Sequence, residues 1–144
     1  MKREFDERLH FVKQKFNSMG TPEEKYSYLI EIGRALPSYP PDLRTPDRIV
    51  PGCQSTLYLH ACLKEDKLFF QSQSDALISQ GLAALLIQVY SGLAPQIILL
   101  NPPLFLHELG IFASLSPHRS NGLASIYARM KQEALQSLRQ IASL

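Results

Sequence analysis

Apolar side chains near the start of the chain recur at the spacing of a helix. Within residues 4–16 they follow one another at steps of three and four with charged residues between them, which predicts an amphipathic helix. The residues of this apolar face are Phe5, Leu9, Val12 and Phe16. Further on, Thr21 can cap a helix, a proline occupies the first helical position, and Glu24 suits a capping box. A second helix is therefore expected from Pro22 to about Ala35.

The middle of the chain changes from a proline-rich loop to an alternating pattern. Prolines at positions 40, 41, 46 and 51 exclude a continuous helix or a central strand from residues 38–51, so an ordered loop is expected there. Over residues 57–63 apolar side chains occupy every second position, which predicts a half-buried strand. The polar residues 64–67 favour a turn, and residues 68–71 are expected to return as the second strand of a hairpin.

The second half of the chain predicts mainly helices. Asp75 and its preceding serine offer an N-cap to residues 76–90, a stretch so uniformly apolar that it is expected to form the central, buried helix. Apolar spacing then predicts a last helix that begins near Pro117 and continues to the C-terminus. This order of elements predicts an α+β fold, with a small antiparallel sheet packed against several helices in one domain over residues 1–144.

Composition and charge agree with one globular domain and exclude some partners. Hydrophobic residues make up 45% of the 144 residues and charged residues 19%, as in an ordinary soluble domain. The net charge is only +2 and both signs are interleaved, so no basic stripe is available for nucleic acid. No apolar run approaches the roughly 20 residues of a membrane-spanning helix, and the charged N-terminus lacks a signal-peptide core. A cytoplasmic protein without a nucleic-acid or membrane partner is expected.

The candidate chemistry centres on Cys53, which lies just before the predicted strand. The preceding Gly52 lets another molecule approach the backbone closely. Hydrogen bonds from Gln54, Ser55 and Thr56, with positive potential from Arg48, would favour the ionised sulfur. From these residues alone, both a reactive thiol and an inert, packed cysteine stay open for Cys53.

Other chemistries find less support in the sequence. A zinc or cluster site needs about four ligands at characteristic spacings, and the two cysteines and four histidines form no such pattern. A cysteine–histidine hydrolase would need an adjacent base and an oxyanion motif, and neither is visible. Cys62 in the predicted strand is expected to pack in the core, and a structural disulfide with Cys53 is not expected in a chain of this size.

The segment at residues 50–55, Val-Pro-Gly-Cys-Gln-Ser, resembles the active-cysteine motif of the SufE family of sulfur acceptors, which includes the related CsdE proteins. Collinear matches extend the resemblance over most of residues 21–130. They lie in the second predicted helix (residues 23–37), at the start of the buried helix (residues 74–82) and at the start of the last helix (residues 116–123). Because the blocks occur in order and at similar spacings, together they are far more specific than any one of them.

The resemblance implies a SufE/IscU-like fold and a relay of sulfur. In this family a pyridoxal-phosphate cysteine desulfurase, SufS- or CsdA-like, holds a persulfide, and the residue matching Cys53 takes over its outer sulfur. The sulfur then passes to a SufBCD-like scaffold complex that builds iron–sulfur clusters, and the carrier also stimulates the desulfurase. Pyridoxal phosphate belongs to the partner, so we expect no cofactor on this chain and a sulfur-transfer partner rather than a stand-alone enzyme.

Asp75 and Arg119 are further site candidates. Asp75 either caps the buried helix or, as the resemblance implies, positions the cysteine loop or contacts the desulfurase. Arg119 is expected in the first turn of the last helix, where the helix dipole disfavours a cation. That position suggests a specific partner such as a carboxylate or the persulfide site, with a structural salt bridge as the alternative. Gly52, Gln54 and Ser55 complete the supporting candidates.

Two other functions stay open at this stage. The chain could stimulate a desulfurase allosterically without itself carrying sulfur, with Cys53 merely buried. It could also sense oxidants through a disulfide between Cys53 and Cys62.

Overall fold

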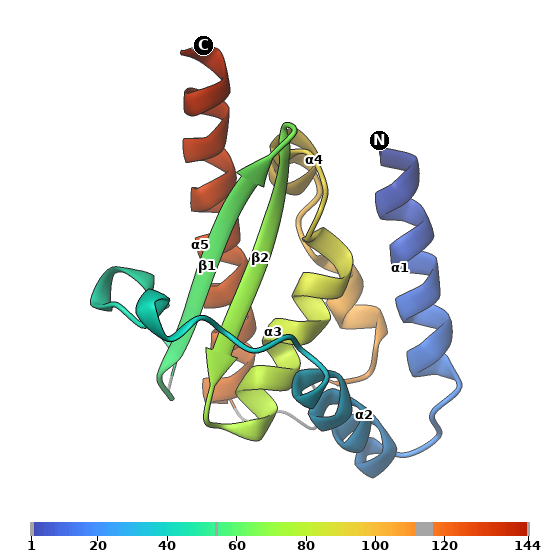
Figure 1. The fold of residues 1–144 in the computed structure, drawn as a ribbon. Helices are drawn as coiled ribbons and strands as arrows, with labels where there is room; N and C mark the ends of the chain where they lie inside the picture. Colours follow the sequence, from blue (N-terminus) through green and yellow to red (C-terminus); the bar gives the residue numbers. More distant parts are fainter. Residues whose placement is uncertain (1, 54, 112–116, 144) are drawn as a thin grey trace.

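The computed structural model describes residues 2–53, 55–111 and 117–143, apart from the side chains of residues 117–121. Within this range an antiparallel hairpin packs against helices that lie behind and beside it in Figure 1. In chain order the elements are α1 (Lys2–Asn17), α2 (Pro22–Arg34), the 3-10 turns η1 (Pro41–Leu43) and η2 (Pro46–Arg48), β1 (Leu57–Lys64), β2 (Lys67–Ser74), α3 (Leu77–Tyr90), α4 (Pro95–Leu100), the 3-10 turn η3 (Leu104–Glu108) and α5 (Pro117–Ala142). The predicted α+β fold is confirmed.

The first two helices form where the apolar spacing and the capping residues predict them. At the start of α2 the Thr21 hydroxyl accepts a hydrogen bond from the backbone N–H of Glu24 at 3.2 Å. The Glu24 carboxylate in turn accepts one from the backbone N–H of Gly20 at 3.3 Å. The first bond satisfies a donor that the first turn of a helix leaves without a partner, and the second ties the residue before the cap to the same turn.

The hairpin is built around a two-residue turn. β1 and β2 pair antiparallel, with Leu57 opposite Ser74 at the far end from the turn. Both turn residues have positive φ, 51° at Glu65 and 62° at Asp66. This is the backbone geometry of a type I′ turn, whose twist matches that of the strands it joins. The predicted turn at residues 64–67 is therefore confirmed.

The second strand is longer than the predicted residues 68–71. Its alternate side chains continue inward past that range, and Ser72 is only 2% exposed. The Ser72 hydroxyl donates a hydrogen bond to the backbone carbonyl of Tyr58 on the neighbouring strand at 2.9 Å. Because its polar group has a partner, this serine can occupy a buried position that the pattern assigns to an apolar residue.

Helix α3 lies at the centre of the fold. Figure 1 shows it between the hairpin and α1, and it contacts α1, α2, α5 and β2. Tyr90 in its last turn is fully buried and packs against the ring of Phe5, with centroids 5.8 Å apart, and that of Tyr127, 5.4 Å away. The Tyr90 hydroxyl donates to the carbonyl of Asn101 at 2.7 Å. One aromatic cluster thus joins α1, α3, α5 and the segment after α4.

The short helix α4 is not among the elements that the apolar pattern predicts. Pro95 occupies its first turn, where the fixed φ of the ring favours a helix and the missing N–H is no loss. At the other end the side-chain amide of Asn101 donates to the carbonyl of Ile97 at 2.9 Å. That bond satisfies one of the carbonyls left over at a helix end.

Helices α2 and α3 approach each other through a pair of glycines. A Cβ atom on Gly81 would collide with the backbone carbonyl of Leu29, and one on Gly33 would lie 2.8 Å from the backbone nitrogen of Gly81. Backbone cannot move aside as a flexible side chain can. The two helices therefore pack at a distance that only glycine permits at these positions.

We expect Gly81→Ala to lower the free energy of unfolding by about 2–3 kcal/mol, because the added methyl group must push α2 away from α3. Urea unfolding measures this change. Gly20→Ala is the matched control, since nothing lies within 4 Å of a Cβ at that position. Equal stabilities of the two variants would show that the contact between α2 and α3 is looser than described.

Candidate functional site

The backbone around Cys53 forms a closed loop at the end of β1. The N–H of Val50 donates to the carbonyl of Leu57 at 2.9 Å, and Ile49 forms an isolated antiparallel bridge with Tyr58. The chain therefore leaves the edge of β1 after Val50 and returns to it at Leu57. Figure 1 shows this loop at the opposite end of the hairpin from its turn.

Gly52 brings the loop against α5. Its φ of +87° lies in the left-handed region that favours glycine, and a Cβ atom there would collide with the hydroxyl oxygen of Ser125. The positive φ favours glycine here, and a larger residue would also have to displace the Ser125 hydroxyl. The sequence predicted that Gly52 lets another molecule approach the backbone closely. In the structure the close neighbour of Gly52 is helix α5 of the same chain.

Ser55 ties the other side of the loop to α3. Its hydroxyl lies 2.8 Å from that of Ser79, so the two share a hydrogen bond across 24 residues of sequence. Cys53 consequently sits between two contacts that hold the loop to different helices. Ser55 supports the loop, whereas the sequence predicted a hydrogen bond from it to the sulfur.

The thiol of Cys53 is half-buried and packs against the hydrophobic core. This burial raises the pKa of Cys53 above its ordinary value, because desolvation disfavours the charged thiolate. Two of the groups that were expected to favour ionisation, Ser55 and Arg48, bond to other partners. The Ser55 hydroxyl bonds to Ser79, and Arg48 is engaged elsewhere.

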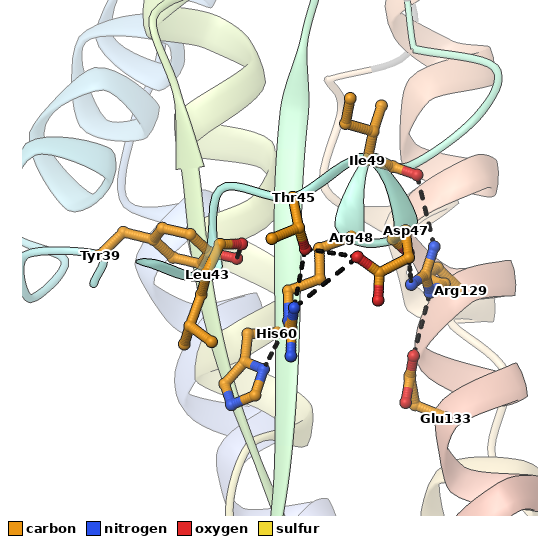
Figure 2. A network of polar contacts seen from close by, with 9 residues as sticks. All are labelled: Tyr39, Leu43, Thr45, Asp47, Arg48, Ile49, His60, Arg129 and Glu133. Atoms are coloured by element: carbon orange, nitrogen blue, oxygen red, sulfur yellow. Dashed lines mark hydrogen bonds and ion pairs between the residues drawn. The ribbon is translucent and has the colours of Figure 1, made fainter. Parts of the chain in front are cut away.

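A polar network lies directly before the loop (Figure 2). The Nε of Arg48 donates to Nδ1 of His60 at 3.1 Å, and its Nη1 donates to the hydroxyl of Thr45 at 2.7 Å. The same hydroxyl donates to the Asp47 carboxylate, and this bond lowers the pKa of Asp47. Because Nδ1 of His60 accepts a hydrogen bond, the neutral ring carries its proton on Nε2.

Arg129 connects α5 to the same segment. Its guanidinium donates to the backbone carbonyl of Asp47 at 2.5 Å and to that of Ile49 at 3.4 Å. Its Nε donates to the carboxylate of Glu133 at 3.1 Å, one turn further along the helix. Figure 2 shows the guanidinium between the loop segment and Glu133.

A groove of about 430 Å³ opens beside this network. Its walls come from η2, β1 and α5, and its polar lining includes Arg48, His60, Arg129 and Gln132. The carboxylates of Asp47 and Glu133 stand next to the two arginines, at 3.7 Å and 3.1 Å. Positive and negative groups therefore balance within the groove.

Asp75, Gln54 and Arg119 are the other predicted site residues. Asp75 is exposed, and the N-cap of α3 is Ala76, which makes no side-chain capping bond. The prediction that Asp75 caps this helix is therefore wrong: the Ser74 hydroxyl accepts from the N–H of Ala76 at 3.3 Å instead. Gln54 and the side chain of Arg119 lie outside the described residues, so their roles stay predictions.

Cys62 is remote from the loop. It lies in β1 opposite Phe69 and is free, as is Cys53. It lies five positions along the strand from Leu57, roughly 16 Å at the rise of a β-strand, whereas a disulfide requires Cα atoms within about 7 Å. Pairing of the two cysteines would need the strand to come apart. Among the described residues, no group of three His, Cys, Asp or Glu side chains could hold a metal ion.

The residues that the sequence analysis missed are Ser79, Ser125 and Arg129. Each lies in a stretch of helical spacing, where a polar residue reads as an ordinary surface position. Their partners are a hydroxyl, a glycine and two backbone carbonyls far away in the sequence. No pattern along the chain signals such contacts.

Comparison with known proteins places this site in a family. The family model for SufE, described as an Fe–S metabolism associated domain, matches residues 11–134 and so includes the cysteine loop, all of α3 and the larger part of α5. The chain belongs to the SufE family. Among the described residues of this SufE-family chain, no helix is both long and apolar enough to cross a membrane.

Individual relatives agree with this assignment. An uncharacterized SufE-like protein of Rhizobium etli is 38% identical over 117 residues, which cover 78% of this chain and 79% of the relative. An uncharacterized SufE-like protein of Synechocystis is 33% identical over 124 residues, 86% of this chain and 78% of the relative. The cysteine desulfuration protein SufE of Wigglesworthia glossinidia brevipalpis is 30% identical over 132 residues, 90% of this chain and 91% of the relative.

A solved structure supports the fold. The solution structure of a hypothetical protein from Thermus thermophilus matches with a TM-score of 0.78 at 24% identity. The match covers 92% of this chain and 96% of that one. The arrangement of helices around a hairpin is therefore shared by a protein of low sequence identity.

Gly52→Ala should lower the free energy of unfolding by about 2 kcal/mol, because a left-handed φ and a collision act together. In a Ser125→Ala background the cost should fall to about 1 kcal/mol, since only the backbone term remains. A double-mutant cycle by urea unfolding measures the coupling. Additive effects at the two positions would mean that the loop does not rest on α5.

His60 should make stability depend on pH. Burial, and then the charge of Arg48, lower the pKa of His60 below 6.5, while Glu133 and Asp42 oppose this more weakly. The unfolded chain therefore binds the proton first, and stability is lost as pH falls from about 6.5 towards the lower pKa of the folded state.

Unfolding at several pH values measures this loss against His60→Asn, which keeps an acceptor for Arg48 but does not titrate. The stability difference between the two proteins should shrink as pH falls below 6.5. His10→Asn, an exposed position on α1, controls for the removal of a histidine. A difference that stays constant from pH 5 to 7.5 would contradict the assignment.

Proposed function

We propose that this protein accepts sulfane sulfur on Cys53 from the persulfide of a cysteine desulfurase and delivers it to a scaffold for iron–sulfur cluster assembly. The observation that carries the proposal is the placement of Cys53 at the tip of a loop held by two helices, inside the region that matches the SufE family. The name of the Wigglesworthia relative, a cysteine desulfuration protein, supports it.

The transfer is a thiol exchange. The Cys53 thiolate attacks the outer sulfur of the persulfide, a new sulfur–sulfur bond forms at Cys53, and the bond in the desulfurase persulfide breaks. The desulfurase cysteine leaves as a thiolate, so the step needs no oxidant or reductant. It also needs no metal or cofactor on this chain, since pyridoxal phosphate serves the desulfurase. The expected compartment is the cytoplasm.

Because the Cys53 thiol is half-buried, the transfer requires that the thiol first become exposed. Because burial raises the pKa of Cys53, the resting thiol is mostly protonated at neutral pH and is a poor nucleophile. Docking must therefore bring the sulfur out of its apolar surroundings before it attacks. This requirement couples sulfur transfer to the partner and protects the thiol while the protein is free.

The same burial is the one observation that favours a second function. A protein that only binds a desulfurase and stimulates it has no need of an accessible thiol. Stimulation could then come from the surface around the loop, with Cys53 acting as a packing residue. The two functions differ in whether the stimulation depends on the sulfur atom.

The intact mass of the protein should rise by one sulfur atom after incubation with a cysteine desulfurase, pyridoxal phosphate and cysteine. The gain should vanish in Cys53→Ser and survive in Cys62→Ser, because Cys62 lies within the paired strand β1, far from the loop. Stimulation of the desulfurase is measured in parallel by the release of alanine.

Cys53→Ser should also lose most of the stimulation, since no acceptor is left for the sulfur. If the variant still stimulates fully, the allosteric function is correct. If the wild-type protein neither gains sulfur nor stimulates a desulfurase, both functions are excluded for that enzyme pair.

A further inference from the structure

Arg129 lies at the junction between α5 and the segment that leads to Cys53. Its side chain is only 16% exposed, so it occupies a defined position, unlike a freely moving surface arginine. Glu133 accepts a hydrogen bond from its Nε at 3.1 Å. The remaining guanidinium nitrogens are thereby directed towards the loop segment (Figure 2).

The contacts of Arg129 to the loop segment are made with backbone. Carbonyls of Asp47 and Ile49, 82 and 80 residues away in the sequence, accept from the two terminal nitrogens. A planar guanidinium can bind two carbonyls at once, which a lysine ammonium cannot do with the same geometry. We call these two bonds the Arg129 clamp.

The clamp acts on the backbone just before the cysteine loop closes. Ile49 adjoins Val50, whose N–H completes the closing bond to Leu57. Within the loop, Gly52 packs against α5, the helix that also carries Arg129, and Ser55 is bonded to α3. The position of Cys53 is therefore set by several contacts along the loop, and the clamp holds the segment that leads into it.

The hydrophobic core does not depend on the Arg129 clamp. Asp47 and Ile49 are both exposed residues of the connecting loop, and the groove beside them leaves the guanidinium within reach of the solvent. The residues that stabilise the fold lie elsewhere, around α3. Removing the clamp should therefore change the loop and leave the unfolding transition nearly unchanged.

We propose that Arg129 is a positioning residue for Cys53, and that its bonds to the carbonyls of Asp47 and Ile49 keep the thiol withdrawn in the free protein. Its biological meaning rests on the proposed function, because only a sulfur acceptor gains from a thiol that is exposed on docking. A partner that reaches the groove and competes for the guanidinium would release the loop.

The test compares Arg129→Gln with Arg139→Gln, which removes an exposed arginine from the last turn of the same helix. Each protein reacts with a small aromatic disulfide, and peptide mapping follows Cys53 and Cys62 separately. Arg129→Gln should raise the rate at Cys53 about tenfold, as expected when a charge-assisted hydrogen bond that favours one of two conformations is lost. The rate at Cys62 should not change.

Two further measurements separate positioning from general weakening. The pH profile of the Cys53 rate should move to lower pH in Arg129→Gln, because a thiol exposed to water loses the burial that raises its pKa. Arg129→Lys should restore part of the wild-type rate, since an ammonium can still bind one carbonyl.

The proposal is overturned if Cys53 in Arg129→Gln reacts within twofold of the wild-type rate. It is also overturned if Cys53 and Cys62 gain reactivity in parallel, which would indicate global opening. Neither outcome involves a desulfurase, so failure of the clamp cannot be confused with failure of the proposed sulfur transfer.

Discussion

Helix α3 is apolar on nearly every side, so it has no polar face to turn towards the solvent. It has to be covered nearly all round, and α1, α2, α5 and β2 provide the cover. The close approach of α2 through Gly33 and Gly81 is one result, because the cover must lie near enough to exclude water. The aromatic cluster around Tyr90 is another, since its hydroxyl needs a partner once it is buried.

The cysteine loop takes its position from this packing. Ser79 belongs to α3 and Ser125 to α5, so the two helices that enclose the core also hold the loop. The thiol rests against the core for the same reason, and its raised pKa follows from its surroundings rather than from any residue next to it in the chain. The half-buried position of the thiol thus follows from where the helices lie.

The parts of the fold that could be predicted are those whose signal is periodic or local. Steps of three and four give α1 and α5, alternation gives β1, and Thr21 with Glu24 gives the start of α2. The short α4 and the far end of β2 could not be predicted, because they depend on a proline at a helix start and on a serine with a buried partner.

The loop with Cys53 could be placed from its glycine and prolines. The direction in which the pKa of the Cys53 thiol shifts could not be predicted, since its burial is set by helices far along the chain. Asp75 was wrongly expected to cap α3: the helix begins one residue later than expected, its N-cap is Ala76, and Asp75 stays exposed.

For the sulfur transfer proposed above, the distance between the two cysteines has a consequence for the lifetime of a persulfide on Cys53. A persulfide is destroyed when a nearby thiol attacks its inner sulfur and expels hydrogen sulfide, leaving an internal disulfide. Cys62 lies well along β1 in a paired strand and cannot reach the loop without breaking the sheet. A sulfur atom loaded on Cys53 therefore has no exit within its own chain, and it leaves only when another molecule comes to take it.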